Sequence, residues 1–254
     1  MWGKRRFLDP ELEQWHLECW AWLLRNLGGL DALRDGPLVT PTGAFFPGVD
    51  GDDHEKALAV FQRVRALMGL EGWPCELVAR ERTNVAVGEF LVLQPEGGKS
   101  IAGTFEAADG VVYITYDPDL VSRPYNLIVT FAHELAHYAL HSFDEPAPGV
   151  DQEPLIEELA TEMAVAFFGF GLIAANAAFE FEQFQDVGRQ GWRGGAWGYF
   201  SEDGWAFALA VFLALRDESA EEAERYLKPR IKKKLQAARA RLDQDPSLLA
   251  ALRG

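Results

Sequence analysis

Two histidines and a glutamate stand at a spacing that can bind and use a metal ion. His133, Glu134 and His137 form the motif H-E-x-x-H within the segment TFAHELAHYALH, residues 130–141. On a helix, the two imidazoles lie one turn apart on one face, and both can reach a Zn²⁺ ion at about 2.0–2.1 Å. Glu134 then projects sideways, toward water at the metal instead of the metal itself. The motif therefore predicts a zinc site in which Glu134 is the general base.

The residues around the motif favour a buried helix. Glu134 is the only charged residue within 130–139, and no proline interrupts that stretch. Buried polar groups without partners are costly, so two histidines and a glutamate on such a helix point to a shared ligand. A surface helix with incidental histidines is the competing interpretation.

A catalytic zinc site needs a third protein ligand, and the sequence offers three candidates. His141 continues the four-residue spacing, but on a straight helix it lies about 12 Å along the axis from His133. The better candidates are Glu157 and Glu158, within the segment PLIEELATEMAVAFFGFG.

At this point the sequence resembles the gluzincin metallopeptidases. These carry H-E-x-x-H on one helix and, on the next, a glutamate ligand followed four residues later by an acid. Glu158 with Glu162 fits that pattern, and the resemblance implies that Glu162 holds His133 by its second ring nitrogen. The segment is also similar to regulatory cytosolic peptidases of the ImmA/IrrE type, whose pattern E-x-x-A-x-x-hydrophobic-A would select Glu157. We favour Glu158 because it accounts for the acid at Glu162, and Glu157 stays the alternative.

The resemblance covers roughly residues 125–170 and departs from the family in two ways. Glutamate stands at position 162, where the family usually has aspartate, and no histidine follows His141. Gluzincins usually add a downstream donor that stabilises the oxyanion. We expect Tyr199 to supply it here, with Arg193 as the second choice.

Both of these residues belong to the segment 186–205, which is rich in glycine and tryptophan. This composition favours a shaped rim or lid over the site. A surface loop whose aromatic side chains cap the core is the alternative.

Helical spacing of apolar residues dominates both ends of the chain. The predicted helices span residues 10–27, 54–68, 125–141, 153–175, 202–216, 221–226 and 229–242. Between the second and third helices, short β-branched and aromatic runs predict three or four strands. These strands span residues 76–79, 89–93, 100–105 and 111–116. His16 and His54 have no partners at metal-binding spacing and are expected on helix surfaces.

The order of helices, sheet and helices predicts an α+β fold. We expect a small, mostly antiparallel sheet beside the H-E-x-x-H helix and a C-terminal helical lobe, which the resemblance describes as zincin-like. An N-terminal helical segment, residues 1–70, is expected to pack on a catalytic domain, residues 71–254, in one compact unit.

Composition narrows the classes of protein to consider. The chain has 254 residues, 48% of them hydrophobic, which is enough for a substantial core. Its 24 Lys and Arg against 39 Asp and Glu give a net charge of −15, which argues against binding to nucleic acid or to anionic membranes. Cys19 and Cys75 are the only cysteines, so a disulfide framework and a cysteine zinc ribbon are excluded. An acidic stretch follows the basic N-terminus in place of a signal peptide's apolar core, so a cytoplasmic protein is expected.

One uncharged run, residues 163–179, raises the question whether the chain spans a membrane. It is slightly shorter than the roughly 20 residues that a bilayer requires, and it contains Asn176. The run therefore predicts a buried core helix, and a membrane-embedded metallopeptidase is the alternative.

The sequence thus predicts a zinc-dependent hydrolase of peptide bonds, with peptides or proteins as the substrates that the resemblance implies. An edge strand within residues 100–116 is expected to pair with an extended substrate. The alternative is a regulatory or scaffold protein whose zinc site is structural or inactive. A structural site would be closed by a fourth protein ligand, for which His141 is the candidate, whereas a catalytic site leaves that position open.

Overall fold

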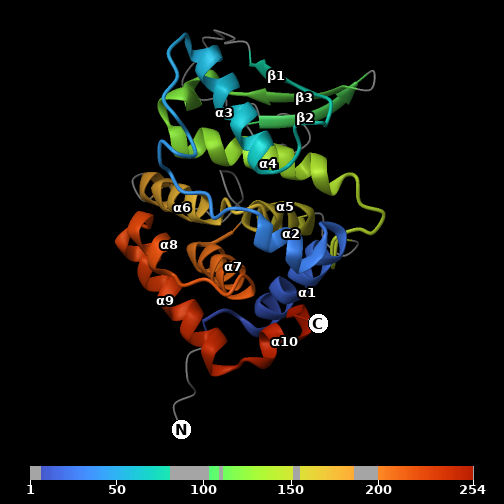
Figure 1. Cartoon of the computed structure of the whole chain (residues 1–254), viewed down its shortest axis with the longest axis vertical. Helices are drawn as coiled ribbons and strands as arrows, with labels where there is room; N and C mark the ends of the chain where they lie inside the picture. Colours follow the sequence, from blue (N-terminus) through green and yellow to red (C-terminus); the bar gives the residue numbers. More distant parts are fainter. Residues whose placement is uncertain (1–6, 81–102, 109–110, 151–154, 186–199, 254) are drawn as a thin grey trace.

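The computed structural model describes residues 7–80, 103–108, 111–150, 155–185 and 200–253, and most of them are helical (Figure 1). The N-terminal helices are α1 (Pro10–Asn26), α2 (Gly29–Asp35) and α3 (Asp53–Leu67). A short 3₁₀ helix, Pro118–Ser122, precedes α4 (Pro124–Leu140), α5 (Leu155–Phe167) and α6 (Gly171–Gln185). The chain closes with α7 (Glu202–Leu215), α8 (Glu221–Tyr226), α9 (Pro229–Gln244) and α10 (Ser247–Arg253). The sequence predicted these helices except the 3₁₀ helix and the short α2 and α10, and it joined α5 to the start of α6.

The sheet is mixed, so the prediction of a mostly antiparallel sheet is wrong, while the α+β class holds. Its described strands are β1 (Cys75–Ala79), β2 (Gly103–Ala108) and β3 (Val111–Tyr116), in the order β1-β3-β2. Strand β3 pairs antiparallel with β2, as a two-residue connection requires, but parallel with β1. Parallel pairing needs a connection that returns the chain to the same end of the sheet, and β2, which lies between β1 and β3 in the chain and runs antiparallel to β3, makes that return. The predicted strand 89–93 lies outside the described residues.

Helix α4 lies between the sheet and the helical lobe (Figure 1). On one side it contacts β2, β3 and α3, and on the other it contacts α5 and α6. Phe131 of α4 packs edge-on against Phe61 of α3 and Tyr116 of β3, with ring centroids 5.4 and 5.6 Å apart. The helix that carries the motif is thus packed from both sides. The absence of other charges around Glu134 predicted such a buried helix.

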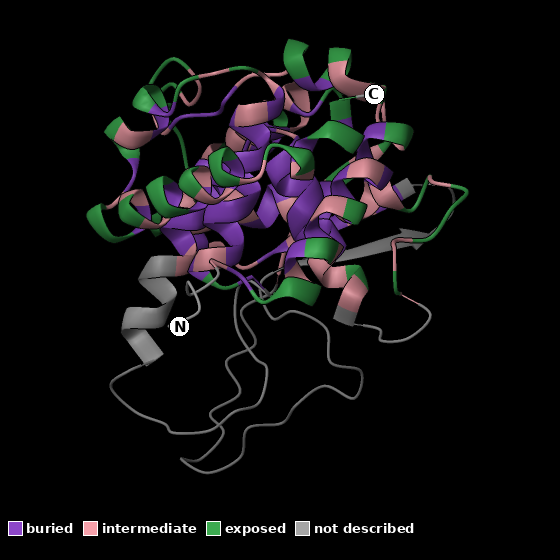
Figure 2. Ribbon diagram, turned by 90° about the horizontal axis from the view of Figure 1, so that it is seen from below, coloured by how far each residue is buried: buried purple, intermediate pink, exposed green. Residues whose placement is uncertain are grey.

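The helical lobe is built around α7, which is buried along nearly its whole length. Figure 2 shows buried residues gathered on the helices in the middle of the molecule. A helix that is apolar on every side belongs in the core. Helices α5, α6, α9 and α10 pack around α7, and α1 packs against both α5 and α10. Helix α1 therefore contacts both α10, from the other end of the chain, and α5, which carries the candidate ligand Glu158.

The single helix predicted over residues 153–175 is wrong, because the chain turns between α5 and α6. Gly169 has φ +88°, and a Cβ atom at this position would overlap the carbonyl oxygen of Pro37. The backbone N–H of Val39 donates to the carbonyl of Gly169 at 3.0 Å. A glycine in close contact with the backbone of residues 37–39 therefore ends α5. Within the part of the chain that the structure describes, no helix combines the length and apolar character needed to cross a bilayer.

Candidate metal centre

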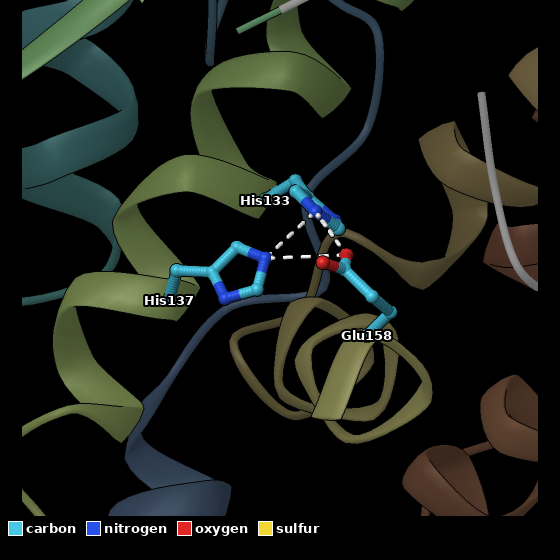
Figure 3. A group of neighbouring side chains, drawn as sticks. All are labelled: His133, His137 and Glu158. Carbon is cyan, nitrogen blue, oxygen red and sulfur yellow. Dashed lines mark hydrogen bonds and ion pairs between the residues drawn. The ribbon is translucent and has the colours of Figure 1, made fainter. Parts of the chain in front are cut away.

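Helices α4 and α5 bring the two histidines of the motif and one glutamate together (Figure 3). His133 and His137 lie one turn apart on α4, with ring centroids 4.7 Å apart and rings nearly perpendicular. Helix α5 packs against α4 and presents Glu158 to both rings. These residues form a possible metal-binding triad.

The three potential ligand atoms converge on one small space. Nε2 of His137 lies 3.1 Å from Nε2 of His133. Oε2 of Glu158 lies 3.3 Å from each of these nitrogens. Two imidazole nitrogens and a carboxylate oxygen thus point at one position that a cation can share.

The triad is enclosed but reachable from solvent. The exposed fractions of the side chains are 12% for His133, 16% for His137 and 30% for Glu158. Among the residues that the structure describes, no fourth side chain joins this group of ligands. The described residues therefore supply three candidate ligands for one metal ion.

In the metal-free protein, the imidazole of His133 and the carboxylate of Glu158 shift each other's pKa. Burial alone would lower the pKa of His133, but the nearby carboxylates of Glu158 and Glu162, with further negative charge from Glu134, raise it to about 10. Burial alone would raise the pKa of Glu158, but its bonds to both histidines lower it to about 2. A protonated His133 beside an ionised Glu158 thus holds the ligands close together in the metal-free protein.

Each histidine has a second partner on α5 at its other ring nitrogen. Nδ1 of His133 lies 3.7 Å from Oε1 of the buried Glu162, an ion-pair distance longer than a hydrogen bond. Nδ1 of His137 lies 3.2 Å from Oγ1 of Thr161, which sequence reasoning missed. The spacing could have revealed it, because Glu158, Thr161 and Glu162 share one face of a helix.

Glu134 directly follows the first histidine of the triad on α4 and is buried. It is 4% exposed. Burial is the main cause that raises its pKa, and Glu158 raises it further, while the two histidines act in the opposite direction. The carboxyl group of Glu134 therefore interacts electrostatically with all three candidate ligands.

Two of the remaining sequence candidates, Glu157 and His141, are not part of the triad. Glu157, the alternative third ligand, is exposed to solvent, and the triad contains Glu158 instead. His141 forms the exposed C-cap of α4 and is outside the triad. Tyr199 and Arg193 lie outside the described residues.

The two histidines expected on helix surfaces have different environments. His54 is exposed, as predicted. The prediction for His16 is wrong, because this residue is completely buried against aromatic side chains.

Comparisons of the chain with protein-family models, with curated proteins and with solved structures gave no match. The donor set of two imidazoles and one carboxylate is one that catalytic zinc sites use.

Proposed function

We propose that this protein is a zinc-dependent hydrolase of peptide bonds, with His133, His137 and Glu158 as the zinc ligands. The spacing of the ligand atoms carries the proposal. In a tetrahedral site with zinc–ligand distances of about 2.0–2.1 Å, neighbouring ligand atoms lie about 3.3–3.4 Å apart. The three separations in the triad are 3.1, 3.3 and 3.3 Å. The residues present therefore fit zinc without a large rearrangement.

The ligand atoms of the triad and the adjacent Glu134 reduce the number of metals to consider. Mg²⁺ and Ca²⁺ prefer oxygen ligands, whereas this triad supplies two nitrogens and one oxygen. Two histidines and one carboxylate also bind Fe(II) in some oxygenases. A buried glutamate next to the first ligand favours a hydrolytic zinc site, because such a glutamate can exchange protons with water.

The chain's own residues provide the proton transfers of a hydrolysis. A bound zinc ion supplies Lewis acidity, which activates water near neutral pH and polarises a carbonyl group. Glu134 accepts the proton of the attacking water and delivers it to the leaving amine. Burial raises its pKa, which brings it closer to the neutral range where a shuttling carboxyl group is effective.

A peptide substrate is the part of the proposal that depends on the resemblance to gluzincins. Strand β2 lies at one end of the described sheet and contacts α4, the helix that bears the motif. An extended peptide can add to such an edge through main-chain hydrogen bonds. The proposed substrate therefore lies along β2, with its scissile bond near the triad.

Metal analysis of the purified protein tests the site. We expect about one zinc per chain in the wild type and little in His137→Ala. A wild type that binds iron instead, or a variant that keeps its zinc, would overturn the assignment.

Substitution of Glu134 by Gln tests the chemistry. It preserves shape and removes the base, so zinc content should stay unchanged while hydrolysis of a fluorogenic peptide library falls by roughly 10²–10⁴-fold. Full activity in Glu134→Gln would refute the mechanism. A zinc-loaded wild type that hydrolyses no peptide would favour the alternative of a regulatory or scaffold protein.

A further inference from the structure

One face of α5 carries three polar side chains toward the histidines of α4. Glu158, Thr161 and Glu162 follow the i, i+3, i+4 spacing of neighbours on a helix surface. Glu158 belongs to the triad, and Glu162 lies beside Nδ1 of His133. Thr161 is completely buried, and its hydroxyl is within hydrogen-bond distance of His137.

The hydroxyl of Thr161 has two contacts and only one proton to donate. Oγ1 lies 2.9 Å from the carbonyl oxygen of Glu157, four residues earlier on the same helix. It lies 3.2 Å from Nδ1 of His137. A carbonyl oxygen can only accept, so the shorter contact uses the hydroxyl proton, and Oγ1 is left as an acceptor toward His137.

We propose that Thr161 is a positioning residue that keeps His137 in the tautomer with its proton on Nδ1. In that tautomer Nδ1–H donates to Oγ1, and Nε2 keeps its lone pair directed at the space shared with His133 and Glu158. This inference depends on the proposed metal site, since its purpose is to present Nε2 as a ligand. The two histidines are thus oriented by different groups: a hydroxyl for His137 and a carboxylate for His133.

Loss of the hydroxyl should favour the wrong tautomer. Without an acceptor at Nδ1, His137 gains more by placing its proton on Nε2 and donating it to Oε2 of Glu158, 3.3 Å away. That proton occupies the direction in which a metal must bind. Removal of a partner of this kind typically weakens metal affinity by about 10–100-fold.

The experiment compares three variants of the full chain. Thr161→Val removes the hydroxyl at nearly constant shape, and Thr161→Ser restores it. Thr130→Val is the matched control, because Thr130 is also buried and also donates to a carbonyl four residues earlier, at 2.8 Å, but on α4. Zinc affinity is measured by competition with a chromophoric chelator.

We expect Thr161→Val to bind zinc at least tenfold more weakly than the wild type. Thr161→Ser and Thr130→Val should stay within about threefold of it. Equal affinity in Thr161→Val and the wild type would overturn the inference. Equal weakening in Thr130→Val would also overturn it, since a general packing effect would then explain the loss.

A second measurement needs no metal and separates this inference from the proposed function. The ¹⁵N NMR spectrum of the metal-free wild type, with His137 assigned by substitution, should show the proton on Nδ1. A proton on Nε2 of His137 would refute the role of Thr161 even if the protein binds zinc. A protein that binds no zinc but carries the Nδ1 proton would refute the proposed function and leave the hydrogen bond standing. This measurement stays decisive if Thr161→Val does not fold.

Discussion

Zinc affinity at this site depends on which of two adjacent carboxylates faces the histidines. Glu158 lies 3.3 Å from both imidazoles, whereas Glu157 is exposed. We predict that Glu158→Ala lowers zinc affinity by more than the roughly 10–100-fold that loss of an outer partner costs, because a ligand itself is removed. Glu157→Ala should leave affinity within about threefold of the wild type. Chelator competition measures both.

The reverse result would favour the ImmA/IrrE-type pattern, in which Glu157 is the ligand. It would also remove the reason for expecting Glu162 to hold the second ring nitrogen of His133. The sequence alone could reduce the choice only to these two positions. Side chains of consecutive residues point about 100° apart on a helix, so the rotation of α5 against α4 decides between them. That rotation follows from packing with several elements, which the motif does not encode.

Thr161 shares a helix face with Glu158 and Glu162, but this spacing alone does not distinguish it from a structural threonine. A threonine in an apolar helix is ordinary, and its hydroxyl usually bonds to its own backbone. Its contact with His137 exists only because α5 lies directly against α4.

At the scale of elements, the corner between α5 and α6 sets where α5 ends. Gly169 has φ +88°, and its position leaves no room for a Cβ atom beside Pro37. We predict that Gly169→Ala lowers the free energy of unfolding by about 2 kcal/mol or more, from left-handed backbone strain and steric overlap. Denaturant titration measures this effect.

Gly171→Ala is the matched control for this corner. Its added Cβ would meet Ala166 at 3.5 Å, an ordinary contact, so the free energy of unfolding should change by less than about 1 kcal/mol. Equal losses in the two variants would contradict the role assigned to Gly169.

Helix positions were predictable because each depends on local periodicity and on end signals. Helix α1, for example, begins after the capping Asp9 and ends beside Gly28, as its sequence indicates. Strand direction was not predictable in this way. The runs that form β1 and β3 carry no mark of parallel pairing, which depends on the path of the chain between them.

At the scale of the whole molecule, the two ends of the chain close the helical lobe. Helix α1 packs against α10, and Arg241 of α9 donates two hydrogen bonds, of 2.7 and 2.9 Å, to the carboxylate of the buried Glu13 on α1. His16, one turn later on α1, is buried against Phe200 and Phe207, with ring centroids 4.9 and 5.5 Å apart. Neither of its ring nitrogens has a hydrogen-bond partner among the described residues.

This buried histidine makes the stability of the whole fold depend on pH. Burial lowers the pKa of His16 from 6.5 to about 3. Between these values the unfolded chain binds the proton and the folded chain does not, so the free energy of unfolding falls as the pH falls. The slope from one such group is up to about 1.4 kcal/mol per pH unit.

We predict that His16→Leu removes this slope, because leucine fills the aromatic surroundings without titrating. The measured quantity is the free energy of unfolding of the variant minus that of the wild type, at pH 7.5 and at pH 5. The difference should rise in favour of the variant by about 2 kcal/mol at pH 5. The triad titrates equally in both proteins, so its contribution cancels in the subtraction. A difference that stays constant between the two pH values would mean that His16 takes up its proton in the folded lobe, and that α1 does not seal this position from water.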